Sequence, residues 1–120
     1  MSDRRVFAGL ISVAEAATVT MILVRVDLKA ADAGADAAGG PLLKRGSFAV
    51  AGERTLAWMS PDEALLMAPR DEGPALEAAL RRAFSRQHAL VQDVSSARCL
   101  YELSGGPVRD VLAKLCPVDF

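Results

Sequence analysis

The sequence predicts an α+β fold, in which a mixed β-sheet carries helices packed on one of its faces. Three observations lead to this class: a β-branched run over residues 18–26, two short apolar runs joined by a proline turn over 55–68, and an amphipathic helix over 74–87. Helices interleaved with a hairpin and adjacent strands are typical of it. The 120 residues are too few for two independent cores, so we expect residues 1–120 to form a single domain.

The first predicted strand is Thr18–Val26, which reads TVTMILVRV and carries one charge, on Arg25. Such a run is typical of a strand buried on both faces, or on one face and in an interface. The alanine-rich stretch Lys29–Gly40 follows, with Gly34 at its middle. Because glycine costs about 1 kcal/mol relative to alanine inside a helix, this stretch predicts a connection with only marginal helix.

The segments Thr55–Met59 and Ala64–Ala68 predict a β-hairpin. Between them lies Ser60-Pro61-Asp62-Glu63, which we interpret as a four-residue loop built on a proline turn. Trp58 belongs to the first of these strands. A ring of that size is usually buried, so we expect it in the core.

A helix is predicted from Pro74 to about Gln87, because proline is favoured at the first helical position. Glu77 and Arg81 are spaced to form an i,i+4 ion pair. The remaining pattern is an apolar stripe that we expect to face a sheet, formed by Leu76, Ala79, Leu80, Ala83 and Phe84.

The last third of the chain predicts two strands and a helix. Ala89–Val94 is followed by a turn and by Arg98–Leu103, in which Cys99, Tyr101 and Leu103 alternate onto one face. The glycines of the next turn lead into an amphipathic helix whose apolar residues are Val108, Val111, Leu112 and Leu115.

The composition argues against nucleic acid as a partner. Fourteen basic and fifteen acidic residues give a net charge of −1, and the densest basic group, Arg81, Arg82 and Arg86, is interpreted as a solvated helix face. Two cysteines and one histidine match no zinc pattern, so no metal site is predicted. We interpret Cys99 and Cys116 as reduced, buried thiols.

No catalytic or cofactor-binding residues are predicted. The Gly105-Gly106 turn lacks the third glycine of a dinucleotide fingerprint. His88, Asp93 and Ser95 are of the triad types, but they crowd into eight residues of strand and turn and so are not expected to converge. The neighbouring carboxylates of Asp62 and Glu63 suit a solvent-exposed turn.

A cytoplasmic location is expected, with an export signal as the alternative. Arg4 and Arg5 precede the apolar run Val6–Val13, a pattern typical of secretion signals. Asp3 and the shortness of the run oppose this interpretation. No uncharged apolar stretch reaches the 18 residues typical of a membrane-spanning helix, so no membrane partner is expected.

Three segments in order carry a resemblance to a known family: Ala57–Pro69 (AWMSPDEALLMAP), Val91–Arg98 (VQDVSSAR) and Leu103–Phe120 (LSGGPVRDVLAKLCPVDF). They resemble the W-x-x-P-D-E-x-L-L-x-A-P, V-x-D-V-S-x-x-R and L-S-G-P-x-x-R-D-V-L-A-K-x-C-P-x-D segments of the gamma subunit of bacterial heterotetrameric sarcosine oxidase. The match covers roughly residues 55–120. Members of the family usually continue beyond Cys-Pro-x-Asp, so a chain that ends at Phe120 is either naturally short or a fragment.

The resemblance implies a non-catalytic subunit of a complex that oxidises sarcosine to glycine, hydrogen peroxide and methylene-tetrahydrofolate. It implies that FAD, FMN, NAD and tetrahydrofolate are bound by partner subunits. The alpha subunit would be the main partner, with the beta and delta subunits in the same assembly. The implied fold is part of the folate-binding aminomethyltransferase fold.

Two alternatives remain open from the sequence. One is a stand-alone module that binds folate itself, as the implied fold suggests. The other is an interaction domain that homodimerises through the strand Thr18–Val26.

Overall fold

The computed structural model describes residues 6–7, 10–16, 19–28 and 47–117. The predicted marginal helix over 29–40 lies outside the described residues. The chain divides into two compact units, Val19–Arg98 and a second that joins Met1–Thr18 to Cys99–Phe120. Each is described by itself, and the single domain expected from the length stays a prediction.

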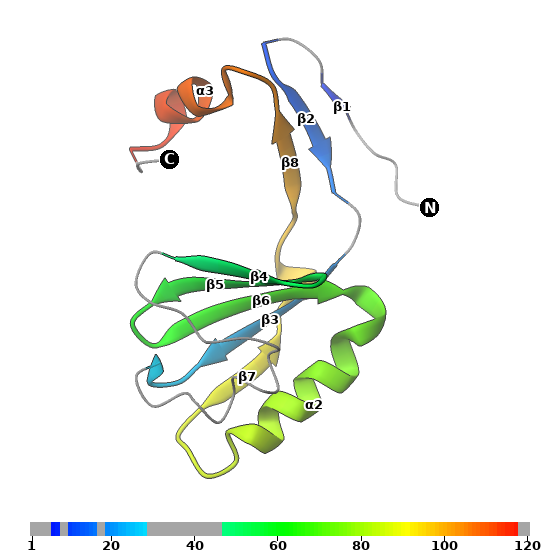
Figure 1. Cartoon of the computed structure of the whole chain (residues 1–120), viewed down its shortest axis with the longest axis vertical. Coiled ribbons are helices and arrows are strands. Elements are labelled where there is room, and N and C mark those ends of the chain that lie inside the picture. Colours follow the sequence, from blue (N-terminus) through cyan, green and yellow to red (C-terminus); the bar gives the residue numbers. More distant parts are fainter. Residues whose placement is uncertain (1–5, 8–9, 17–18, 29–46, 118–120) are drawn as a thin grey trace. The chain divides into compact units, whose positions relative to one another are not determined.

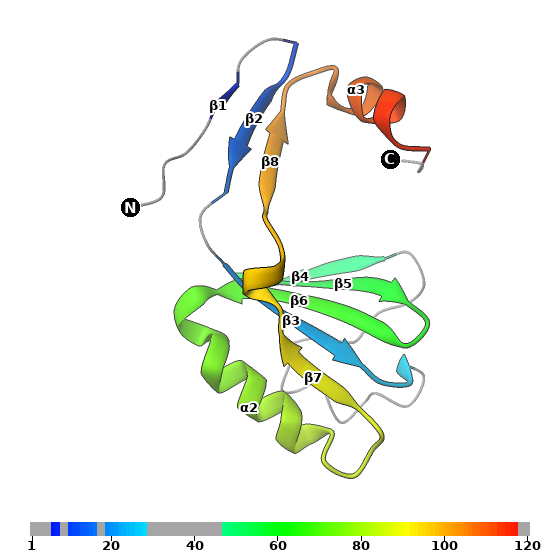
Figure 2. The ribbon, with the colours of Figure 1, turned by 180° about the vertical axis from the view of Figure 1, so that it is seen from behind.

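Unit Val19–Arg98 is built on a five-stranded sheet with the order β4-β5-β6-β3-β7 (Figures 1 and 2). Its strands are β3 (Val19–Arg25), β4 (Phe48–Ala51), β5 (Arg54–Ser60), β6 (Glu63–Pro69) and β7 (Leu90–Asp93). Its helical segments are η2 (Arg70–Glu72), α2 (Gly73–Ala83) and η3 (Ser95–Ala97).

All pairings in this sheet are antiparallel among the strands that the structure describes, where the sequence predicted a mixed sheet. The reason lies in the connections. Tight turns link β4, β5 and β6, whereas α2 carries the chain from β6 across to β7 with β3 between them. Because β3 is antiparallel to both neighbours, β6 and β7 run in the same direction without pairing.

The core lies between the sheet and α2, on the face where Ile22, Leu56 and Leu66 are register partners. These three side chains are buried, and Leu76, Leu80 and Phe84 of the α2 segment pack against them. Figure 1 shows α2 beside β7 and β3, the strands that it contacts. This confirms both the α+β class and the predicted stripe of α2, whose Ala79 and Ala83 are partly buried.

Helix α2 starts where the chain passes close to β3. Gly73 is buried, and the hydroxyl of Thr20 on β3 donates to the carbonyl oxygen of Arg70 at 3.2 Å. Arg54 Nε donates to Glu72 Oε2 at 3.1 Å, which ties the start of β5 to the start of the helix. The helix begins one residue before Pro74 and ends at Ala83, earlier than predicted, because the Ser85 amide bonds back to the Arg82 carbonyl in a tighter final turn.

The other unit contains a three-stranded antiparallel sheet with the order β1-β2-β8. Its elements are β1 (Val6–Phe7), β2 (Ser12–Glu15), β8 (Tyr101–Ser104) and α3 (Val108–Leu115). None of its residues with described side chains is buried, and Leu10 and Leu115 are each 79% exposed. The described side chains of this unit therefore add little apolar burial to its stability.

The hairpin and the first strand are confirmed with changes of detail. Strand β3 is buried at Met21, Ile22 and Val24, as expected for a strand covered on both faces. The loop between β5 and β6 is shorter than predicted, since Ser60 pairs with Glu63 across the turn. The prediction that Trp58 lies in the core was wrong: it is only partly buried, next to a register shift that bends β5.

Candidate functional site

The carboxylates of the Ser60–Glu63 turn are engaged with β3. Arg25 Nη2 lies 2.7 Å from Glu63 Oε1, and Arg25 Nε lies 3.7 Å from Asp62 Oδ2. The carbonyl oxygen of Asp62 also accepts from the Val26 amide at 2.9 Å, and its side chain accepts from Ser60 Oγ at 2.8 Å. The polar residues of this turn therefore fasten the hairpin to the end of β3.

The segment around Asp93 and Ser95 also fastens the sheet. Ser95 Oγ accepts from the Met21 amide at 2.8 Å and donates to Asp93 Oδ1, which accepts from the Ser95 amide at 2.9 Å as well. These two hydrogen bonds from Ser95, the side-chain one first, lower the pKa of Asp93 below its ordinary 3.8, against a small opposing effect of burial. The contacts of Ser95 and Asp93 extend the pairing of β3 with β7 beyond Asp93, the last residue of β7. There the Val94 amide also donates to the Met21 carbonyl.

His88 does not join these groups, so no triad forms, as predicted. It precedes β7, whereas Asp93 and Ser95 lie at or beyond the other end of that strand. His88 instead borders an open depression of about 980 Å³, together with Arg25, Asp27 and Asp62. Ligand sites are usually enclosed and apolar with a few convergent polar groups, and this depression is open and of mixed charge.

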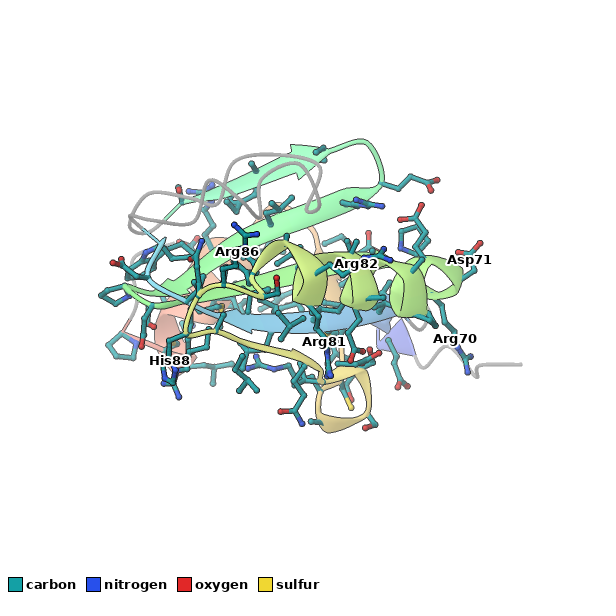
Figure 3. All side chains as sticks on the ribbon, turned by 90° about the horizontal axis from the view of Figure 1, so that it is seen from below. Arg70, Asp71, Arg81, Arg82, Arg86 and His88 are labelled. Atoms are coloured by element: carbon teal, nitrogen blue, oxygen red, sulfur yellow. The ribbon has the colours of Figure 1, made fainter. Side chains whose placement is uncertain are left out.

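The basic residues of the α2 segment do not form one patch. Figure 3 shows Arg81 apart from Arg82 and Arg86. Arg81 Nη2 lies 2.7 Å from Glu77 Oε1, which confirms the predicted i,i+4 pair. All three arginines are exposed, in agreement with the solvated helix face inferred from the sequence.

The Gly105-Gly106 turn serves the backbone of its own unit. Gly105 has φ +127°, a conformation that favours glycine, and a Cβ there would lie 3.4 Å from the Ile11 Cα. Only eight residues of α3 follow this turn. The geometry fits a tight turn between β8 and α3 and offers no cradle for a dinucleotide phosphate.

The interpretation of both cysteines as buried thiols was wrong. Cys99 is exposed and Cys116 is partly exposed, and neither forms a disulfide. Strand β8 begins at Tyr101, later than predicted, so Cys99 lies outside the alternation that was expected to turn it inward. Within the described part of the chain, no group of three or more His, Cys, Asp or Glu residues is arranged to hold a metal ion. No helix among the same residues is long and apolar enough to cross a bilayer.

The most unusual surface is the face of the five-stranded sheet opposite α2. Register partners share a face, and two cross-strand rows lie on this one. We call it the apolar face; its residues are Val50, Thr55, Met67 and Met21 in one row and Phe48, Ala57, Leu65 and Leu23 in the other. Among these eight residues only Thr55 is polar, whereas a solvated face of an antiparallel sheet normally carries polar residues. The same face becomes polar toward β7, where Gln92 is the partner of Leu23 and the next row holds the Arg25–Glu63 ion pair. The sequence patterns did not predict this surface, because β4 was not recognised as a strand.

Strand β3 lies inside its sheet, between β6 and β7. Its backbone groups are therefore paired on both sides, with register partners from Val19 to Arg25 on β6 and from Ile22 to Arg25 on β7. Over Ile22–Arg25 the strand therefore has no free edge with which a second copy of the chain could pair.

Comparison of the sequence with known proteins shows the family to which this chain belongs. Residues 26–120 match the family described as "Sarcosine oxidase, gamma subunit family". The chain is 39% identical over 116 residues to the sarcosine oxidase subunit gamma of an Arthrobacter species, an alignment that covers 93% of this chain and 56% of that protein. It is 44% identical over 62 residues to the sarcosine oxidase subunit gamma of Corynebacterium sp. (strain P-1), covering 52% and 30% of the two chains.

A solved structure gives the same result. The fold matches a chain of the heterotetrameric sarcosine oxidase from Corynebacterium sp. U-96 in complex with pyrrole 2-carboxylate, with a TM-score of 0.70 and 30% sequence identity. The match covers 93% of this chain and 60% of that one. The chain thus spans less than two thirds of the length of these relatives.

Proposed function

We propose that this chain, which belongs to the sarcosine oxidase gamma subunit family, is one subunit of a heterotetrameric sarcosine oxidase. In this proposal the chain has no active site of its own. The observation that carries the proposal is that the segments resembling the family serve to stabilise the fold. The polar groups of Ser60–Glu63 and of Asp93 and Ser95 are all engaged in holding the sheet together. Groups committed to such contacts stabilise the fold and are poorly placed to act on a substrate.

The reaction and its cofactors would then belong to other subunits. We propose that sarcosine is oxidised there to glycine, hydrogen peroxide and methylene-tetrahydrofolate, with FAD, FMN, NAD and tetrahydrofolate bound by those chains. An alpha subunit would be the main partner, and beta and delta subunits would complete the assembly. The heterotetrameric state of the similar Corynebacterium sp. U-96 enzyme supports a complex of several subunits.

Two finer assignments belong to the same proposal. The fold would correspond to part of the folate-binding aminomethyltransferase fold, which a helix packed on an antiparallel sheet allows but does not distinguish from other α+β folds. The complex would be cytoplasmic, which two cysteines without a disulfide favour.

Co-purification tests this function. The chain, tagged and co-expressed with the large sarcosine oxidase subunits encoded in the same genome, is expected to retain polypeptides that carry flavin absorbance. The same host expressing the tag fused to an unrelated domain provides the control. Recovery of the chain alone, from cells in which the large subunits are present and folded, would contradict the proposal.

A further inference from the structure

The apolar face is open at one end and closed at the other. At the β3 end, Met21 is 5% exposed and Leu65 on β6 is 7% exposed. At the β4 end, Phe48 is 71% exposed and Val50 is 66% exposed. The large side chains on β4 thus continue two partly buried rows into solvent, and an apolar surface at that end would complete the same layer.

The edge of the sheet points to the same location. Strand β4 reads Phe-Ala-Val-Ala, without any charge or proline, and among the strands that the structure describes it pairs with β5 alone. Exposed edge strands usually carry lysine, proline or a bulge, because an unprotected edge promotes aggregation. An edge strand that lacks these features is expected to be covered by another surface in the functional assembly.

The chemistry of the face defines what can cover it. None of the eight residues is charged. Charged groups of a partner would therefore be buried on this face without an opposite charge, which is unfavourable. Interfaces of permanent complexes are larger and more hydrophobic than transient ones and resemble a domain core cut in half. A half-buried row of Leu, Met, Val and Phe residues has this character.

We propose that the β4 end of the apolar face, centred on Phe48 and Val50, docks onto an uncharged apolar surface of a larger subunit in the same complex. This inference rests on the proposed function, since it names the surface through which the chain would be held. A large subunit is favoured over a second copy because the chain resembles a subunit of a hetero-complex. The central position of β3 also leaves no free strand edge for the homodimer that the sequence left open as an alternative.

Two variants on β4 test the proposal in the co-expressed complex. Phe48→Lys and Val50→Lys place a charge within the expected interface, and each should weaken binding at least about 30-fold, as for the loss of a central interface residue. The matched control is Ala78→Lys, because Ala78 is exposed on α2, which packs on the opposite face. Retention of the large subunits by the tagged chain is measured for each variant, together with the melting temperature and the sedimentation of the isolated chain.

Each outcome decides the question. Loss of the large subunits by both β4 variants, with retention by Ala78→Lys and unchanged melting temperatures, is the expected result. Retention by the β4 variants at wild-type levels overturns the proposed surface and leaves the proposed function intact. If the unsubstituted chain retains no large subunit, the proposed function itself fails.

Two further results would also overturn the docking surface. A marked fall in melting temperature for Phe48→Lys in the isolated chain would mean that this chain covers the residue itself. A wild-type dimer that dissociates in Val50→Lys would mean that a second copy covers it.

Discussion

Replacing Gly73 by alanine probes the closest approach between α2 and the sheet. A Cβ on Gly73 would lie 2.6 Å from Thr20 Oγ1 and 3.1 Å from Thr20 Cγ2. Thr20 has little room to move, because it is 4% exposed, is branched at Cβ and donates its hydroxyl to the Arg70 carbonyl at 3.2 Å. The added methyl group therefore has to push β3 and the start of α2 apart.

The expected magnitude follows from two opposing terms. Overpacking of a well-packed interior costs about 1–3 kcal/mol. The higher helix propensity of alanine offsets up to about 1 kcal/mol of this cost. We therefore expect Gly73→Ala to lower the free energy of unfolding by about 1–2 kcal/mol.

Removing the obstacle should reverse the effect. Thr20→Ala alone loses the hydrogen bond to Arg70 and should cost about 1 kcal/mol. In that background neither Oγ1 nor Cγ2 is present, so Gly73→Ala should be neutral or stabilising by up to about 1 kcal/mol. The coupling between the two sites should reach about 2 kcal/mol.

The assay is urea denaturation of the four chains, followed by circular dichroism and by the fluorescence of Trp58. Gly106→Ala is the control, because a Cβ there would meet nothing within 4 Å, and it should change the stability little. If Gly73→Ala destabilised the Thr20→Ala chain as much as the wild type, the close contact would not be the cause and the reasoning would be refuted.

Three further predictions concern Asp93, Leu80 and Arg25, which stabilise other parts of the same unit. Asp93→Asn should destabilise the chain at neutral pH, and the difference should shrink as the pH falls below 3.8, because the depressed pKa of Asp93 contributes stability that is present above its ordinary value and lost as the carboxylate is protonated. Urea titrations at several pH values check this, and a pH-independent difference would exclude Asp93 as the titrating group. Leu80→Ala, at a fully buried position, should cost about 2–5 kcal/mol by denaturation, and a cost below 1 kcal/mol would contradict a core between α2 and the sheet. Arg25→Ala removes an exposed ion pair with Glu63 and should cost less than about 1 kcal/mol, a limit that thermal melts at low and high salt can test.

Local patterns in the sequence predicted much of unit Val19–Arg98. The β-branched run of β3, the Pro61 turn and the stripe of α2 were recognisable because each depends on neighbours close in sequence. Strand β4 was missed, although Gly52 after it has φ +63° and is followed by Glu53 in a two-residue connection to β5. A glycine at the first position of such a turn is a known hairpin signal and could have revealed the strand.

The remaining misses depend on contacts between distant parts of the chain. Whether Trp58 is buried depends on what covers its strand, and alternation along one strand does not contain that information. Cys99 is exposed because β8 begins only at Tyr101. The hydrogen bond from the Met21 amide to Ser95 Oγ joins residues 74 positions apart, so a local pattern could not predict it. The apolar face became recognisable only when the register placed Phe48 and Ala57 beside Leu65.

The central claim is that this chain contributes shape and adhesive surface while other subunits perform the oxidation. Sarcosine-dependent hydrogen peroxide formation, measured for the purified chain and for the co-purified complex at equal protein concentration, tests it most directly. We predict turnover by the complex and none by the chain alone. Peroxide formed by the isolated chain at a rate comparable to that of the complex would contradict the account.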